Sequence, residues 1–297
     1  MKKKPRTNRV ITWTIALVCV ALAGAVVWAI VSGVTKLMHY GEQTIIESEL
    51  PKPPAEEQNA VVDEPEEPLP PNRYYDDGFY EVDGIRSYQG GDYYGVPGID
   101  VSEHQTDIDW KAVKEAGIEF AMIRVGFRGW LSGELSLDAH FYDNIEGALD
   151  AGLDVGIYFF SQALTPQEAV EEAEFVLKEI EPYNITYPVA FDWEEVHDQK
   201  HTPRTNEMNM LMLTSCAEAF CKKIESAGYD AAIYFNQSYG YGQLNLSSLL
   251  DYDFWLAEYA DTPSFTHDFQ MWQYTDQGKV PGIQNDVDLN IAFKRKN

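Results

Sequence analysis

Asp192 and Glu194 are the residues of this 297-residue sequence whose types and spacing most directly indicate chemistry. They flank Trp193 at the end of a strongly apolar run, residues 187–193. Residues i and i+2 of a β-strand point to the same face, so both carboxyl groups would lie on one side. Two carboxyl groups at short range drive their pKa values apart, and one can stay protonated near neutrality. Such a pair suits hydrolysis of a glycosidic bond.

Further acidic residues stand at the ends of other predicted strands. They are Asp100 and the pair Asp286 and Asp288. Taken alone, any one of these acidic groups is explained equally well by a solvated loop or by a helix N-terminus. Acidic residues at the ends of three separate strands favour a common site, because the carboxyl ends of barrel strands meet on one face.

Aromatic residues and one arginine near strand ends are candidates for substrate binding. Sugar rings stack on aromatic faces, and the polar edges of tyrosine and tryptophan form hydrogen bonds. The alternative for each aromatic residue is packing in a barrel core or between strand and helix. The candidate set is Tyr158, Tyr234, Trp255, Trp272, Tyr274 and Arg124.

Short β-rich runs and helical patterns alternate along the chain from Gly95 onward. The eight runs are 98–101, 119–125, 154–160, 187–193, 231–235, 253–257, 269–274 and 286–290. Helices are expected after Asp109, over about 138–151, from the Thr165-Pro166 capping box to near Pro182, and over about 205–227, with a short one near 239–250. Ala-Gly pairs at Gly117, Gly152 and Gly228 join helices to strands, with glycine in the left-handed position.

This alternation predicts a parallel α/β sheet with right-handed crossovers. Eight strands in about 200 residues suggest a closed, TIM-like barrel that lacks helices in its final third. The cysteine and histidine spacings match no metal-binding pattern, so no metal or other cofactor is expected. Cys216 and Cys221 are five residues apart in a predicted helix, a spacing that regular helix geometry cannot bridge with a disulfide.

The first 39 residues differ sharply in charge from the remainder. The sequence holds 48 acidic and 22 basic residues, a formal net charge of −26, which argues against nucleic-acid binding. Residues 1–39 hold six of the basic residues and no acidic one. The uncharged run 10–35 is long enough for a transmembrane helix, and the positive charges before it place residues 1–9 in the cytoplasm. A cleaved signal peptide, which would release a secreted protein, is the alternative.

Residues 36–94 separate this run from the predicted catalytic domain, residues 95–297. Seven of the 15 prolines fall between Pro51 and Pro71 among many glutamates, a composition typical of an extended, solvated linker. The stretch 73–95 is rich in tyrosine instead. We expect its rings to form a strap packed on the following domain, with a sugar-stacking surface as the alternative.

Ordered motifs give the domain a resemblance to a known family. They are GIDVSEHQ (98–105), IDW (108–110), FAMIRVGFRG (120–129), AGLDVGIYFFSQA (151–163), VAFDWEE (189–195), WLAEY (255–259), MWQY (271–274) and VDLN (287–290). Over about residues 95–294 the sequence resembles glycoside hydrolase family 25, the Chalaropsis-type lysozymes. The resemblance implies a (β/α)5(β)3 barrel and no cofactor.

The resemblance also implies an activity and roles for the acidic residues. The family cleaves the β-1,4 bond between N-acetylmuramic acid and N-acetylglucosamine in peptidoglycan. Glu194 would be the general acid, Asp192 would orient the substrate N-acetyl group or stabilise charge on it, and Asp100 and Asp288 would be the other active-site acids. Attack by water and attack by the substrate's own acetamido group both stay open. His104 departs from the family, because an aromatic residue such as tryptophan is common there.

The sequence thus predicts a membrane-tethered muramidase that acts on peptidoglycan glycan strands outside the cell. Two other functions stay open. One is a chitinase or N-acetylhexosaminidase on a similar barrel, and the other is a catalytically silent wall-binding scaffold protein.

Overall fold

The computed structural model describes residues 68–296, and a closed ring of eight strands lies at the centre of this part of the chain. The ring runs in the order β3 (Tyr93–Val101), β4 (Phe120–Arg128), β6 (Asp154–Ser161), β7 (Val189–Trp193), β8 (Ala231–Asn236), β9 (Asp253–Ala257), β10 (Met271–Gly278) and β11 (Val287–Arg295). Pairing of β11 with β3 closes it. All eight predicted strands are therefore present, and the predicted barrel is confirmed.

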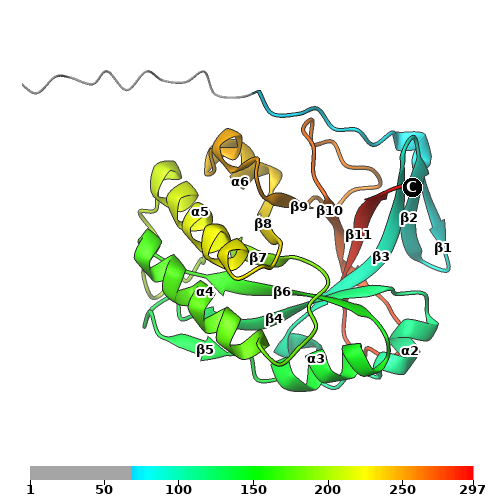
Figure 1. The fold of residues 1–297 in the computed structure, drawn as a ribbon, viewed down its shortest axis with the longest axis horizontal. Helices are drawn as coiled ribbons and strands as arrows, with labels where there is room; N and C mark the ends of the chain where they lie inside the picture. Colours follow the sequence, from blue (N-terminus) through cyan, green and yellow to red (C-terminus); the bar gives the residue numbers. More distant parts are fainter. Residues whose placement is uncertain (1–67, 297) are drawn as a thin grey trace, which may run out of the picture. The chain divides into compact units, whose positions relative to one another are not determined.

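Helices follow only the first five barrel strands (Figure 1). They are α2 (Trp110–Glu115), α3 (Phe141–Asp150), α4 (Pro166–Ile180), α5 (Met210–Ser226) and α6 (Gln237–Gly242), with short 3-10 helices at Asp76–Gly78, Glu103–Gln105 and Leu246–Leu249. Asp109 caps α2 and Thr165 caps α4, as predicted. Gly117, Gly152 and Gly228 have positive φ angles of 98°, 76° and 91°, which suit glycine as the residue after each helix.

Two predicted helix starts were wrong. α3 begins at Phe141 instead of about residue 138, because the Asp138 carboxyl group lies outside the helix and accepts from the Glu103 backbone N–H at 3.1 Å and from Arg124 Nε at 2.7 Å. α5 begins after its cap Asn209 instead of near Thr205, whose hydroxyl donates to Gln162 at 2.8 Å. Both residues therefore serve tertiary contacts that the local pattern does not reveal.

Strand alternation divides the core into an inner and an outer layer. Phe120 and Met122 fill the barrel interior with residues of the other strands, and the Phe120 ring stacks on Tyr187 at a centroid distance of 4.4 Å. Gly98 allows this filling, because a Cβ there would meet the Phe120 ring at 2.2 Å. The alternate residues, such as Ile123 and Val125, pack outward against the helices. Side chains fill the interior of the barrel, so a site can form only at an end of it.

The direction of β11 corrects one feature of the prediction. The seven barrel strands before β11 pair in parallel with one another, but β11 is antiparallel to both of its neighbours, β10 and β3. The loop from β10 to β11 contains no helix that could carry the chain back across the barrel. The start of β11, instead of its end, therefore lies beside the carboxyl ends of the other strands.

The tyrosine-rich segment before the barrel forms a hairpin that extends the sheet. Its strands β1 (Phe79–Val82) and β2 (Ile85–Gly90) are antiparallel, and β2 pairs with β3 (Figure 1). The Tyr74 ring stacks on Phe293 at 3.7 Å, and its hydroxyl donates to the Phe269 carbonyl at 2.6 Å. Tyr74 and Tyr88 are buried, so packing on the barrel is confirmed for these two rings. A short strand, β5 (Leu135–Leu137), pairs with β4 at the other end of the sheet.

Among residues 68–296, no helix has the length and apolar character needed to cross a bilayer. The predicted transmembrane helix, residues 10–35, and the predicted linker up to residue 67 lie outside the described residues. The last prolines of the proline-rich stretch are described and do not form a solvated linker, because the Pro70 carbonyl accepts from the Asp268 backbone N–H at 2.8 Å and Pro71 forms a β-bridge with His267.

Candidate active site

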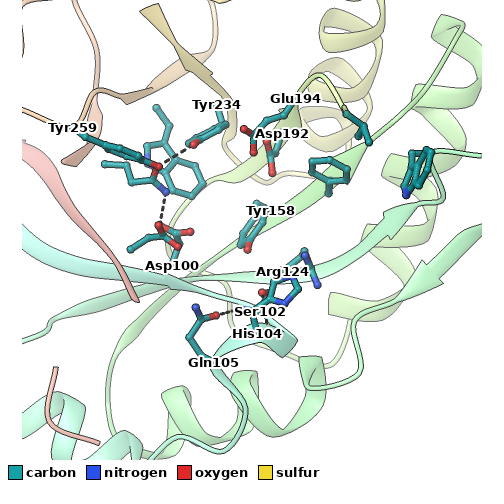
Figure 2. Close-up of a pocket in the computed structure, with 16 residues that line it drawn as sticks. Asp100, Ser102, His104, Gln105, Arg124, Tyr158, Asp192, Glu194, Tyr234 and Tyr259 are labelled. Atoms are coloured by element: carbon teal, nitrogen blue, oxygen red, sulfur yellow. Dashed lines mark hydrogen bonds between the residues drawn. The ribbon is translucent and has the colours of Figure 1, made fainter. Parts of the chain in front are cut away.

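Four acidic side chains meet in one pocket at the end of the barrel. Asp100 near the end of β3, Asp192 on β7, Glu194 just after β7, and Asp288 at the start of β11 all line it (Figure 2). Its volume is about 460 Å³. The structure thus brings together the four residues that the sequence predicted as catalytic, whereas Asp286 is exposed and does not line the pocket.

Asp100 is held by two side-chain amides. Gln273 Nε2 and Asn290 Nδ2 donate to Asp100 Oδ2 at 2.9 Å and 2.8 Å. Each amide is oriented in turn. Gln273 Oε1 accepts from the Tyr234 and Tyr259 hydroxyls, both at 3.0 Å, and Asn290 Oδ1 accepts from the Trp255 indole at 2.8 Å. These acceptor contacts leave each amide nitrogen free to donate to the carboxylate.

Gln273 and Asn290 were missed as site residues by the sequence reasoning. Both lie within quoted motifs, MWQY and VDLN, and Asn290 is two residues from Asp288 on one strand. The period of two along β11 would have placed Asn290 on the face of Asp288. Gln273 has no such signal, because alternation along residues 271–274 separates Met271 and Gln273 from the two aromatic rings but does not show which face points into the barrel.

Trp272 and Tyr274 do not reach the pocket, so the prediction that they bind substrate there is not supported by their positions. They flank Gln273 on β10 and therefore point to the other face of the strand. The Trp272 indole is fully buried and donates to the Glu258 carbonyl at 2.8 Å. The Tyr274 hydroxyl accepts from the Arg86 backbone N–H at 3.0 Å. Both rings attach the N-terminal hairpin to the barrel.

The other predicted binding residues do line the pocket. Tyr158, Tyr234 and Trp255 stand around its wall, with the Tyr158 and Tyr234 rings edge-on to Trp255 at 6.0 Å and 4.9 Å. Arg124 also lines it, but its guanidinium is already paired. Arg124 Nε donates to Asp138 Oδ2 at 2.7 Å and Nη2 to Glu103 Oε1 at 3.2 Å. These bonds fix the arginine beside the acidic groups.

The remaining lining residues come mainly from loops and from the short 3-10 helix after β3. They are Ser102, His104, Gln105, Trp130, Phe160, Val196 and Tyr259. Phe160 and Tyr259 belong to the aromatic residues near strand ends in the sequence. Trp130 and Val196 carried no signal, because loop residues lack the periodicity that assigns a side chain to a face.

Asp192 and Glu194 point to the same side of the chain, as the i, i+2 spacing predicted, and Trp193 points away from them. Asp192 and Glu194 line the pocket, whereas the Trp193 ring packs against Tyr239 at 5.5 Å. The backbone at Glu194 is anchored, since its carbonyl accepts from Gln162 Nε2 at 3.0 Å. This anchor holds the acid where β7 ends.

Burial and repulsion from neighbouring carboxylates raise the pKa values of Asp192 and Glu194. For Asp192, burial is the largest cause of the raised pKa, and Glu194 and Asp100 add to it while Arg124 opposes it. For Glu194, burial again comes first and Asp100 second. Asp192 Oδ1 is buried without a hydrogen-bond partner among the described residues. A protonated Asp192 therefore has hydrogen-bonding capacity that the described residues leave unused.

Asp100 and Asp288 form a second acidic pair with unequal surroundings. Burial raises the pKa of both carboxyl groups, and the charge of Asp100 raises the pKa of Asp288 further. The donors Asn290 and Gln273 stabilise ionised Asp100 and hold its pKa down to about 6. Asp100 therefore ionises first, and Asp288 keeps its proton and hydrogen-bonds to it.

Comparison with known proteins agrees with this geometry. The family described as "Glycosyl hydrolases family 25" matches residues 99–283, a range that excludes β1, β2 and β11. The autolytic lysozyme of Clostridium acetobutylicum is 28% identical over 196 residues, which are 66% of this chain and 55% of that protein. This chain thus spans about half the length of the clostridial relative.

Solved structures share the fold. The bacterial lysozyme from Streptomyces coelicolor superposes with a TM-score of 0.54 and 25% identity, covering 68% of this chain and 93% of that one. The modular autolysin LytC from Streptococcus pneumoniae, solved with a synthetic peptidoglycan ligand, gives a TM-score of 0.60 at 24% identity over 73% of this chain and 52% of that one. Because the family match covers more than half of its residues, the chain belongs to glycosyl hydrolases family 25.

Proposed function

We propose that the chain is a muramidase, which hydrolyses the β-1,4 bond between N-acetylmuramic acid and N-acetylglucosamine in peptidoglycan. The observation that carries the proposal is the convergence of Asp192, Glu194, Asp100 and Asp288 in one open pocket. Lysozymes among its relatives, and LytC with its peptidoglycan ligand, support the same bond and substrate. Glycoside hydrolysis needs a carboxylic acid near the leaving oxygen and further carboxyl groups to stabilise positive charge on the sugar.

Glu194 is the general acid in this proposal. Its raised pKa keeps the carboxyl group protonated to higher pH than an ordinary glutamate, and its position after the strand leaves it partly exposed to the pocket. A general acid must both hold a proton at the working pH and reach the leaving oxygen. Asp192 is buried more deeply, which suits contact with a bound sugar substituent better than proton delivery to the bridging oxygen.

Asp192 positions the substrate N-acetyl group. Its unpartnered Oδ1 provides a polar contact that the protein leaves unused, next to the carboxyl group of Glu194. Ionised Asp100, held by its two amide donors, faces the same space and stabilises the positive charge that develops on the sugar ring. Asp288 assists by sharing its proton with Asp100.

The test is hydrolysis of purified peptidoglycan, with the released fragments identified by mass spectrometry. Wild-type protein is expected to release fragments with N-acetylmuramic acid at the reducing end. Glu194→Gln is expected to lower turnover by roughly 10²- to 10⁴-fold while keeping the fold. Glu195→Gln is the matched control, because Glu195 is the exposed neighbour that does not line the pocket.

Three outcomes would overturn parts of this proposal. Cleavage of chitin but not peptidoglycan would assign a chitinase or N-acetylhexosaminidase activity instead. Binding to peptidoglycan without any turnover would assign a silent scaffold protein. Full activity of Glu194→Gln would remove Glu194 from the role of acid.

Membrane attachment is the second part of the proposal. The uncharged run 10–35, preceded by five basic residues, supports a single span with the N-terminus in the cytoplasm and the barrel outside the cell. The proline-rich segment that follows would act as an extended spacer, so that the barrel could contact peptidoglycan at a distance from the membrane. In cells that express the full chain, we expect the protein in the membrane fraction after alkaline extraction. A shortened protein in the medium would support cleavage and secretion instead.

A further inference from the structure

The peptide bond that follows Glu194 is held on both sides by side chains. Its carbonyl, which belongs to Glu194, accepts from Gln162 Nε2 at 3.0 Å. Its N–H, which belongs to Glu195, donates to the Tyr239 hydroxyl at 3.2 Å. Both polar groups of this one peptide bond are therefore bound by residues from other parts of the chain. We call the Gln162 and Tyr239 side chains the clamp.

This peptide bond lies just beyond the paired part of β7. β7 lies between β6 and β8 in the sheet (Figure 1). Its last pair with β6 is at Trp193, and its last pair with β8 is at Asp192. Hydrogen bonds between strands fix the backbone only where residues are paired. Glu194 lacks that support, and the clamp supplies two bonds of the kind that neighbouring strands would make.

Each side chain of the clamp is itself fixed. Gln162 follows directly after β6 and is fully buried, and its Oε1 accepts from the Thr205 hydroxyl at 2.8 Å. This acceptor contact directs the amide nitrogen toward the other side, where it can donate. Tyr239 lies on α6, where its backbone N–H donates to Asn236 Oδ1 at 3.0 Å and its ring packs against Trp193 at a centroid distance of 5.5 Å. The clamp is thus in place before any substrate binds.

The clamp can act on a reaction in the pocket only through Glu194. Neither Gln162 nor Tyr239 lines the catalytic pocket, whereas Glu194 does. The pKa of Glu194 is raised because the carboxyl group is buried and because Asp100 is near. Both causes depend on where the backbone places this carboxyl group. If the peptide bond could rotate, the group could turn toward solvent and its pKa would fall.

We propose that Gln162 and Tyr239 are positioning residues, which hold the peptide bond after Glu194 and thereby direct its carboxyl group at the leaving oxygen of the substrate. The proposal rests on the proposed muramidase function, in which Glu194 is the general acid. Thr205 contributes indirectly, because its hydroxyl orients the Gln162 amide. Since small displacements of a reacting group cost rate, the clamp acts on kcat more than on substrate binding.

Two substitutions that each remove one hydroxyl group test the proposal. Tyr239→Phe removes the acceptor of the Glu195 N–H, and Thr205→Val removes the donor that orients Gln162. Each is expected to lower kcat on peptidoglycan strands roughly tenfold while KM stays within about twofold. The alkaline limb of kcat/KM should move to lower pH, because Glu194 loses its proton more readily when its carboxyl group is less buried.

Three further variants serve as controls. Tyr241→Phe removes an exposed hydroxyl group of the same helix, α6, which bonds to Thr266 instead. Thr202→Val changes an exposed residue close to Thr205 that does not line the catalytic pocket. Both are expected to keep the wild-type rate and the wild-type alkaline limb. Thr205→Ser keeps the hydroxyl group and is expected to restore both properties that Thr205→Val loses.

Titration of the Glu194 carboxyl group measures the effect of the clamp without turnover. NMR follows its labelled carboxyl carbon, whose signal is the one that Glu194→Gln lacks. The midpoint is expected at lower pH in Tyr239→Phe and Thr205→Val than in the wild-type protein. Burial raises the pKa of Tyr239 above its ordinary value of 10.0, so its hydroxyl group is uncharged while Glu194 titrates. The variants also keep the acidic groups whose charges interact with Glu194, which are Asp100, Asp192 and Asp288.

The two readouts separate failure of the clamp from failure of the enzyme function. A lower kcat with an unchanged alkaline limb and an unchanged midpoint would overturn the proposal, because the loss would then come from general loosening of the barrel. Wild-type rates in both clamp variants, or no recovery in Thr205→Ser, would also overturn it. A lowered midpoint in a protein that cleaves no peptidoglycan would contradict the muramidase function alone and would support the clamp.

Discussion

Asp288 lies directly opposite Asp100, because β11 runs antiparallel to β3 and pairs these two residues in register. The antiparallel direction places the start of β11 at the same end of the barrel as the end of β3. Two carboxyl groups then share one buried space, where burial and like charge raise both pKa values. The amides of Asn290 and Gln273 determine which carboxyl group of the pair ionises, since both donate to Asp100.

Asn290→Ala is expected to shift the acidic limb of the activity profile to higher pH. The Asn290 donor stabilises ionised Asp100, whose pKa is about 6, so its loss raises that pKa and more alkaline conditions are needed to ionise the group. A shift of about one pH unit is expected in kcat/KM. Asn285→Ala is the control, because Asn285 donates to the His104 carbonyl and to none of the four acids. An acidic limb that stays in place would contradict the role of the amide.

Asp192→Asn is expected to remove activity and to stabilise the protein at alkaline pH. The folded-state pKa of Asp192 is raised above its ordinary value of 3.8, so its contribution to stability is present below that value and is lost as the pH rises through the folded pKa. Asparagine does not titrate, so the variant does not lose stability as the pH rises through this range. Melting temperatures measured from pH 4 to pH 9 should therefore diverge, with the variant higher at the alkaline end. Parallel curves would show that Asp192 is not the buried, titrating group described above.

Arg86→Met is expected to lower activity although Arg86 does not line the catalytic pocket. The arginine ties the hairpin to the carbonyls of Ala260 and Asp261, next to Tyr259, whose hydroxyl binds Gln273. Loosening this loop should lower kcat/KM on a tetrasaccharide by roughly tenfold, since small displacements of site residues cost rate. Arg295→Met is the control, because its pairing with Asp92 is exposed on both sides. Equal kinetics of the two variants would exclude a positioning role for Arg86.

Glu172→Ala is expected to destabilise the barrel by about 3 kcal/mol. Glu172 is fully buried on α4, where its two oxygens accept from Arg128 Nε at 2.7 Å and from Ser161 Oγ at 2.6 Å. Its removal leaves the buried Arg128 guanidinium without its principal partner. Urea unfolding at pH 8 measures the change. Glu174→Ala, which breaks an exposed pair with Lys223, should cost under about 1 kcal/mol, and equal losses would refute the distinction.

The sequence alone was sufficient for the eight barrel strands and for the five helices to within a few residues, and together with the family resemblance it was sufficient for the four acidic residues. Each strand and helix has a local signal, such as the Thr165 cap of α4 or the glycine after α2, that needs no distant contact. The spacing of Asp192 and Glu194 already determined their common face, because strand alternation is a local property of the backbone.

Only the tertiary structure decided the direction of β11, the orientation of β10 and the attachment of the hairpin. Residues 271–274 alternate two aromatic rings with Met271 and Gln273, and local sequence gives no reason for the polar Gln273 to face inward. That choice depends on Asp100, 173 residues away, which needs a donor in a buried space. A hydrogen bond between residues far apart in the sequence leaves no periodic pattern in that sequence. This contact could therefore be recognised only in the folded barrel.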